Sequence, residues 1–213
     1  MCIKNIFEKK KYQEKNFLNL DISRKDIACI IYTSGTQGNP KGVMLSHGGI
    51  LSNCEGALFL LKDFTSKKAR FLTWLPLSHS YEHTVQFVQI ALGAKVFYAE
   101  SIEKLIKNMG ECNPDIMTAV PRFYQNLYQK INASFNKTNG LKKYLINKML
   151  SLGEKAFFKN KLSNLEKVQN IICEKLVRKK IKAQFGGSLK LFISGGGALD
   201  KDVGVFLNAI GLP

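Results

Sequence analysis

Short apolar runs alternate with longer amphipathic stretches along most of the chain. Residues 27–33 form a continuous apolar, β-branched run, which predicts a strand buried on both faces. Further runs predict strands at residues 70–75, 94–99, 115–119 and 189–193. Helical spacing of apolar residues predicts helices at residues 46–62, 80–92, 101–112, 122–132 and 201–210. No internal repeat is present.

Helix-end signals support these boundaries. Ser46 and Ser101 are placed to cap two of the helices, and Gly93 is placed to end a third. Residues 141–183 are helical in pattern and carry no strand signal. Alternation of strands and helices predicts an α/β fold with an open, mostly parallel sheet and helices on both faces. A helical insert is expected at about residues 132–185. Residues 1–20 are expected to form a basic, flexible lead-in.

Composition narrows the class of protein. Hydrophobic residues make up 45% and charged residues 23%, as in soluble globular proteins. No apolar run reaches the length of a membrane span, and the first residues lack the apolar core of a signal peptide. The expected location is therefore cytoplasmic, with the inner membrane surface as a peripheral alternative. The five cysteines are scattered, which argues against a disulfide framework and a zinc site.

The charge is unevenly distributed. The formal net charge is +16, and residues 130–185 contain 14 Lys or Arg against 3 Asp or Glu. Base composition of the coding DNA, a membrane-surface role and nucleic-acid binding could each explain this excess. Lysines outnumber arginines 28 to 4, whereas nucleic-acid readers rely on arginine for bidentate contacts. Nucleic acid is therefore not expected as a partner.

The strongest chemical signal is the segment YTSGTQGNPKG, residues 32–42, between a predicted strand and a predicted helix. Glycines let backbone N–H groups approach an oxyanion, hydroxyl side chains add donors, and a lysine adds positive charge. The residues of these three kinds that we expect to bind phosphate are Thr33, Ser34, Gly35, Thr36, Gly38 and Lys41. The segment is therefore a predicted phosphate loop.

A Walker P-loop is the main competitor for this segment. That motif places four residues between its first glycine and a Gly-Lys-Ser/Thr ending. Here the residue directly before Lys41 is Pro40 instead of glycine, and Gly42 stands where the magnesium-binding hydroxyl would be. The pattern therefore disfavours a P-loop NTPase. A plain surface turn is also disfavoured, because eleven consecutive positions fit one pattern.

Residues 32–42, with VMLSH behind them, resemble the phosphate loop of the AMP-forming acyl-activating superfamily. This group includes acyl- and aryl-CoA synthetases, adenylation domains and luciferases. Gln37 stands where threonine is commoner. Two more segments resemble family motifs in order and spacing: LPLSH at residues 75–79 and SGGGAL at residues 194–199. The helical stretch 132–185 and residues 75–83 resemble the long-chain fatty acyl-CoA synthetase branch.

The resemblance implies a fatty acid–CoA ligase that uses ATP, Mg²⁺ and CoA and proceeds through an acyl-adenylate. Lys41 and His79 would be the catalytic residues, Lys41 also holding the β- and γ-phosphates and His79 orienting the carboxylate. The segment that would flank adenine consists of Gly195, Gly196, Gly197 and Ala198. No metal-ligating residue is assigned.

The resemblance covers residues 26–213, which is less than half of a complete family member, so residues 21–213 are expected to be a partial AMP-binding domain. The family's aromatic-Gly-x-Thr-Glu motif, its ribose-binding Asp and its C-terminal lysine do not occur in the matched region. We therefore expect this chain alone to be inactive. Two alternatives remain: an inactive nucleotide-binding remnant, and a basic module that binds anionic membranes at their surface.

Overall fold

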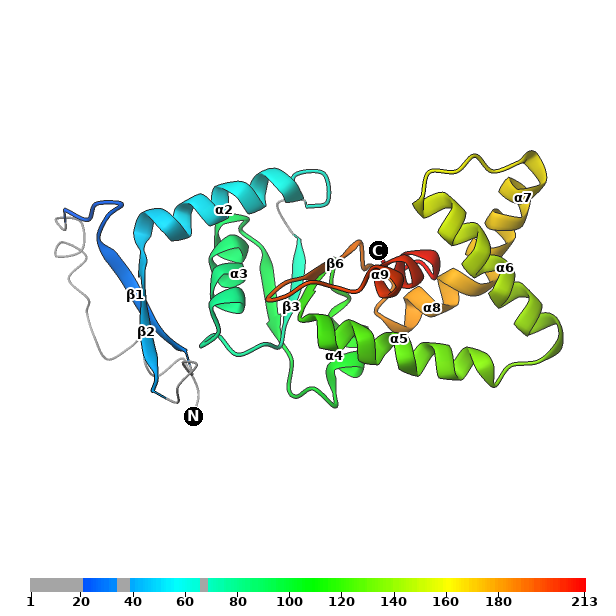
Figure 1. The fold of residues 1–213 in the computed structure, drawn as a ribbon, viewed down its shortest axis with the longest axis horizontal. Coiled ribbons are helices and arrows are strands. Elements are labelled where there is room, and N and C mark those ends of the chain that lie inside the picture. The colour runs from blue at the N-terminus through cyan, green and yellow to red at the C-terminus, as the bar shows by residue number, and fades with distance from the viewer. Residues whose placement is uncertain (1–20, 34–38, 66–68) are drawn as a thin grey trace. The chain divides into compact units, whose positions relative to one another are not determined.

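The computed structural model describes residues 21–33, 39–65 and 69–213, so the expected lead-in over residues 1–20 lies outside the described part (Figure 1). The chain divides into two compact units, residues 1–52 and residues 53–213. The first contains a hairpin, and the second contains a parallel sheet with its helices.

The hairpin of the first unit consists of β1 (Ile27–Thr33) and β2 (Lys41–Ser46), which pair antiparallel. The strand prediction for β1 is confirmed, but the prediction that it is buried on both faces is wrong. Ile30 is 52% exposed and Tyr32 is 71% exposed. The β-branched run favours extended backbone, whereas burial requires layers on both faces. Among the described residues, β1 pairs with β2 alone.

No strand was predicted between the phosphate loop and the helix, yet the backbone of residues 41–46 pairs with β1. Helix α2 (His47–Leu61) follows directly. The hydroxyl oxygen of Ser46 accepts a hydrogen bond from the Gly49 N–H at 3.1 Å. Ser46 is therefore the predicted N-cap, satisfying one of the unpaired N–H groups at the start of the helix.

The second unit contains a four-stranded, wholly parallel sheet in the order β4-β3-β5-β6. Its strands are β3 (Arg70–Thr73), β4 (Lys95–Tyr98), β5 (Ile116–Ala119) and β6 (Leu191–Ser194). Each predicted strand of this unit is found, within a few residues at its ends. The predicted α/β class with a mostly parallel sheet is confirmed.

The helices of the second unit lie between these strands in the chain, except α9, which follows β6. They are α3 (Ser80–Ala91), α4 (Leu105–Cys112), α5 (Pro121–Asn136), α6 (Gly140–Phe157), α7 (Asn164–Cys173), the π-helix η2 (Glu174–Arg178), α8 (Lys179–Gln184) and α9 (Lys201–Ala209). Helix α4 begins four residues later than predicted. The Ser101 hydroxyl accepts only a long bond, 3.4 Å, from the Lys104 N–H, within a turn that precedes the helix.

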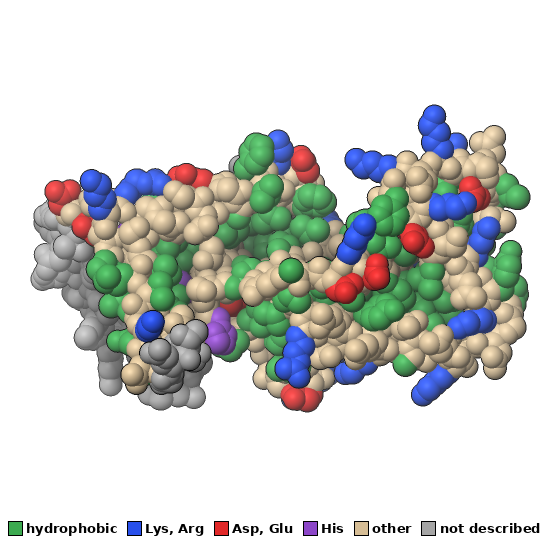
Figure 2. Space-filling model, in the orientation of Figure 1, with side chains coloured by type: hydrophobic (Ala, Val, Ile, Leu, Met, Phe, Trp, Pro, Cys, Tyr) green, Lys and Arg blue, Asp and Glu red, His purple; other side chains and the backbone are tan. Residues whose placement is uncertain are grey.

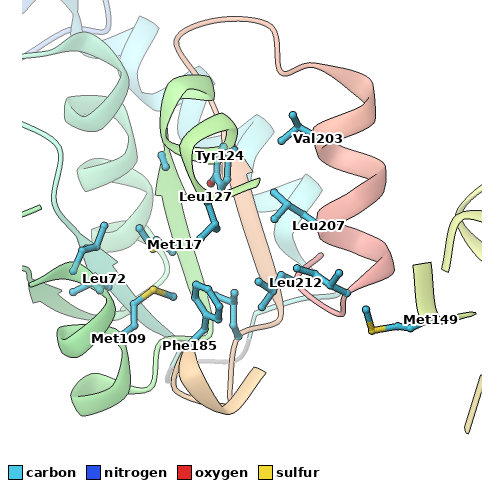
Figure 3. Close-up of a cluster of buried hydrophobic side chains, with 14 of the residues drawn as sticks. Leu72, Met109, Met117, Tyr124, Leu127, Met149, Phe185, Val203, Leu207 and Leu212 are labelled. Carbon is cyan, nitrogen blue, oxygen red and sulfur yellow. The ribbon is translucent and has the colours of Figure 1, made fainter. Parts of the chain in front are cut away.

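The two faces of the sheet are covered by different helices. Leu72 and Met117 point into the main core, where they meet side chains of α4, α5 and α9 (Figure 3). Side chains alternate along a strand, so Thr73 and Thr118 point to the opposite face. There they meet α3, because Thr118 donates to Glu82 and Gln89 donates to Thr73. Helices on both faces explain why β5 is buried along its whole length.

The expected helical insert is helical, but it is interrupted between α6 and α7. Helix α7 begins with a capping box. The Ser163 hydroxyl accepts a hydrogen bond from the Glu166 N–H, and the Glu166 carboxylate accepts one from the Ser163 N–H. Further along, the buried Arg178 guanidinium donates to the carbonyl oxygens of Ala209 at 2.6 Å and Met149 at 3.2 Å. This side chain therefore ties the insert to α9.

Candidate functional site

The candidate site of the second unit is the edge of the sheet where β3, β5 and β6 end. The segments that leave this edge are residues 74–79, residues 120–121 and the glycine turn at residues 195–199. In open parallel sheets, ligands bind beyond the carboxyl ends of the strands. Two of the three motifs found in the sequence therefore emerge at the same edge.

The glycine turn lies against the start of α3. The Gly195 N–H donates to the Ala119 carbonyl oxygen at 3.1 Å, so the turn begins beside the end of β5. A Cβ atom at Gly195 would lie 2.0 Å from Cε2 of Tyr81. Only glycine fits at this position, because the aromatic ring of Tyr81 occupies the space of a side chain. Gly196 has a φ of +76°, which also favours glycine.

Two tyrosines hold the end of β6 in place. The hydroxyl groups of Tyr81 and Tyr124 both donate to the carbonyl oxygen of Ile193, at 3.2 and 3.0 Å. Burial raises the pKa of both phenols, and the neighbouring Glu82 raises that of Tyr81 further. Both hydroxyls therefore remain neutral donors, and they fix α3 and α5 to the strand that carries the glycine turn.

His79 is the N-cap residue of α3, two positions before Tyr81. Its backbone N–H donates to the Pro76 carbonyl oxygen at 3.1 Å, which closes the turn of the LPLSH segment. Its side chain is exposed and does not cap the helix. The structure thus brings the histidine motif and the glycine turn to the same edge, with Tyr81 as the contact between them.

Glu82 was missed as a site residue by sequence reasoning. Its side chain is fully buried, and Oε2 accepts from the Thr118 hydroxyl at 3.2 Å. Its Oε1 has no partner in the described part of the chain. Burial raises the pKa of this carboxyl, and hydrogen bonds from Thr73 and Thr118 offset only part of that rise. The sequence signal that could have identified Glu82 as a site residue is its position between Tyr81 and His83, next to the histidine motif.

The predicted phosphate loop belongs to the first unit, and only its ends are described. Thr33 and Lys41 are register partners at the end of the hairpin, and the Thr33 hydroxyl donates to the Lys41 carbonyl oxygen at 3.4 Å. Both residues are exposed. The other predicted phosphate-binding residues, Ser34, Gly35, Thr36 and Gly38, lie outside the described residues.

The chemistry available at these positions suits an anionic, nucleotide-like ligand. The start of α3 presents unpaired N–H groups beside an exposed imidazole, and Gly196, Gly197 and Ala198 form an exposed turn. In the first unit, taken by itself, Lys41 is an exposed cation at the end of the hairpin. Within residues 21–33, 39–65 and 69–213, no group of three or more His, Cys, Asp or Glu side chains is placed to hold a metal ion.

Comparison with known proteins agrees with the motifs. Residues 4–212 match the family of AMP-binding enzymes. The chain is 34% identical over 183 residues to the peroxisomal long chain acyl-CoA synthetase 6 of Arabidopsis thaliana, covering 85% of this chain and 25% of that protein. It is 32% identical over 188 residues to fatty acyl-CoA synthetase A of Dictyostelium discoideum, covering 88% of this chain and 27% of the relative. The chain thus spans about a quarter of the length of these relatives.

Solved structures share the fold. The adenylation domain of a carboxylate reductase from Mycobacterium chelonae superposes with a TM-score of 0.59 at 18% identity, covering 88% of this chain and 25% of that one. ATP-bound MatB from Rhodopseudomonas palustris superposes with a TM-score of 0.54 at 23% identity, covering 88% of this chain and 28% of that one. At these identities the likeness concerns the fold alone.

Proposed function

The chain belongs to the AMP-binding enzyme family, and from that premise we propose that it is part of a long-chain fatty acid–CoA ligase. In the first step of the proposed reaction, a carboxylate oxygen of the fatty acid attacks the α-phosphorus of ATP. The bond to the bridging oxygen breaks, and diphosphate leaves the acyl-adenylate. In the second step, the CoA thiol attacks the acyl carbon, and AMP leaves with the bonding electrons.

The residues of this chain would position charge rather than form covalent bonds. Lys41, the Thr33 hydroxyl and the predicted loop residues Ser34, Gly35, Thr36 and Gly38 would hold the β- and γ-phosphates. At the sheet edge, His79 would orient the fatty-acid carboxylate. The turn from Gly195 to Ala198 would lie along the adenine ring.

One observation carries the proposal: Tyr81 fills the space that a side chain at position 195 would need. Through this contact the histidine motif and the glycine turn lie next to each other, although more than a hundred residues separate them in the chain. An acyl carboxylate beside His79 and a nucleotide base beside the glycine turn would then be neighbours, as the joining of acid to AMP requires.

The proposal is tested by a chimaera in which this chain replaces the matching region of the Arabidopsis synthetase 6. We expect the chimaera to form palmitoyl-CoA, AMP and diphosphate from palmitate, ATP and CoA. The matched control carries His79→Ala, which we expect to slow adenylate formation on the order of 10²-fold while leaving the chimaera folded. A folded chimaera that binds ATP but forms no adenylate from any fatty acid would count against the function.

We also propose that the helical insert contacts anionic membrane surfaces, at a cytoplasmic or inner-membrane location. Helix α7 supports this, because its apolar residues Leu165, Val168 and Ile171 recur at helical spacing and are 68%, 56% and 55% exposed. Lys and Arg side chains are scattered over this part of the molecule (Figure 2). An apolar stripe with basic neighbours is typical of helices that lie at a membrane surface. No helix among the described residues is long and apolar enough to cross a membrane.

Sedimentation with lipid vesicles tests the membrane contact. We expect binding to anionic vesicles at low salt, weaker binding at high salt and little binding to neutral vesicles. Replacing Leu165 and Val168 by Asp should abolish sedimentation. Ile90→Asp with Ile106→Asp, at exposed apolar positions of α3 and α4, is the matched control. Equal binding to both vesicle types would leave the base composition of the coding DNA as the explanation of the lysine excess in this segment.

A further inference from the structure

A cavity lies in the helical part of the second unit, away from the residues of the sheet edge. Its volume is about 820 Å³, within the range of pockets that hold small-molecule ligands. Its walls come from the second half of α5, the first half of α6, and η2 with α8. None of its lining residues belongs to the histidine motif or to the glycine turn.

The walls of this cavity are mainly apolar. Leu145, Leu176 and Ile181 are typical of the lining, and the Leu176 side chain is 50% exposed. Apolar side chains left in contact with water at a concave surface favour an apolar ligand, because binding removes their surface from water. The cavity is therefore suited to a hydrocarbon chain.

The polar part of the lining carries charge of one sign. Lys130, Lys142 and Lys180 come from three different helices, and the lining contains no Asp or Glu. Within the described part of the chain, none of these three ammonium groups has a hydrogen-bond or ion-pair partner. By contrast, the nearby Lys182 pairs with Glu174 at 3.1 Å. Three uncompensated cations at an apolar cavity complement a ligand with one anionic end.

We propose that this cavity binds a free long-chain fatty acid, with its carboxylate among Lys130, Lys142 and Lys180 and its chain along the apolar walls. This site would be additional to the place where the carboxylate reacts near His79. The proposal rests on the charge and shape of the cavity and stands independently of the ligase reaction. A bound fatty acid would hold α5, α6 and α8 together, since each contributes a lysine or an apolar wall.

Equilibrium binding of palmitate, without ATP or CoA, tests the proposal in the purified chain. We expect saturable binding that weakens at least tenfold in the variant Lys130→Gln, Lys142→Gln, Lys180→Gln. The matched control has the same loss of charge at exposed helical positions outside the cavity: Lys167→Gln, Lys175→Gln, Lys179→Gln. Binding of the neutral analogue hexadecanol should be weaker than that of palmitate and should not change in either variant.

A second variant and a mapping experiment keep the result unambiguous. Leu176→Asp places a negative charge in the lining at a half-exposed position, so it should weaken palmitate binding without unfolding the chain. A palmitate with a photoreactive diazirine on its chain should label peptides of α5, α6 and α8. These readouts do not depend on catalysis, so an inactive chimaera would leave them unchanged.

Several outcomes would overturn the proposal. They are an absence of saturable palmitate binding, equal losses in the two lysine variants, equal affinity for hexadecanol, and labelling confined to the peptides around His79 and Gly195. Displacement of palmitate by anionic phospholipid vesicles that contain no free fatty acid would assign the cavity to a membrane lipid instead. Retained binding in the Leu165→Asp, Val168→Asp variant would separate this site from the membrane contact of α7.

Discussion

Lys41 is the residue whose role in the proposed reaction can be tested most directly. Its ammonium would neutralise charge that grows on the departing diphosphate, so its loss should lower kcat more than it raises the KM for ATP. In the chimaera, Lys41→Ala should slow adenylation on the order of 10²–10³-fold. Lys41→Arg should also be impaired, because a planar guanidinium is not a compact point charge.

The second half-reaction provides the control for Lys41. Thioester formation from synthetic acyl-adenylate and CoA no longer involves diphosphate, so it should be nearly unchanged in Lys41→Ala. Lys25→Ala, at another exposed position of the first unit, should leave both half-reactions intact. If the two half-reactions fall equally in Lys41→Ala, then Lys41 supports the structure of the loop and does not contact the phosphates.

The buried Glu82 carboxyl should make the stability of the second unit depend on pH. Burial raises its pKa in the folded state, so between the unfolded pKa, about 4.3, and the folded pKa the folded chain binds more protons. The contribution of Glu82 to the free energy of unfolding should therefore be most favourable below this window and should fall by about 1.4 kcal/mol per pH unit as pH rises through it.

The glutamine side chain of Glu82→Gln cannot ionise, so this variant should lose the part of the pH-dependent fall in the free energy of unfolding that comes from Glu82. Urea unfolding followed by the fluorescence of Trp74 measures it, because the Trp74 indole donates to the Thr118 carbonyl oxygen beside Glu82. Glu154→Gln, on the exposed surface of α6, is the control. Parallel pH profiles for Glu82→Gln and the parent would contradict the argument.

Among the elements, the crossing of α6 and α9 depends on a glycine. A Cβ atom at Gly153 would lie 2.4 Å from the Cα atom of Ala209, so the helix backbones approach closely there. Gly153→Ala should lower the free energy of unfolding by about 1–3 kcal/mol, the usual cost of overpacking. Gly56→Ala in α2, where no atom lies within 4 Å, should raise it by up to about 1 kcal/mol.

Both glycine variants gain the same helix propensity, so their difference isolates the packing of α6 against α9. Urea unfolding followed by circular dichroism measures it. A Gly153→Ala chain as stable as Gly56→Ala would mean that the two helices can separate without loss, and that the buried Arg178 bonds alone hold the insert.

At the scale of the whole molecule, we expect no steady-state acyl-CoA formation by this chain alone. The 213 residues contain no aromatic-Gly-x-Thr-Glu segment of the kind that the family resemblance calls for, and they span about a quarter of the relatives' length. The measurement is thioester production from palmitate, ATP and CoA, with the complete Arabidopsis synthetase as the positive control. Production above a no-enzyme blank would show that this chain is sufficient.

The sequence by itself determined the local elements and the motifs. Apolar runs fixed the strands of the parallel sheet, since short β-branched segments favour extended backbone wherever they are paired. Ser46 identified the start of α2 through its own hydroxyl. The residue types of the phosphate loop and the histidine motif indicated the chemistry, because hydroxyls, lysine and imidazole have the same donors in any fold.

Only the tertiary structure decided which faces are covered and which residues meet. The pattern of residues 27–33 predicted a buried strand, yet they form a largely exposed strand of a hairpin, because burial depends on the layers that pack against a strand. The contact between Tyr81 and Gly195, the burial of Glu82 and the lysine-lined cavity all join residues distant in the chain. No local pattern encodes such pairs. The first two arise where the parallel sheet brings the ends of its strands together, and the cavity arises where α5, α6, η2 and α8 pack against one another.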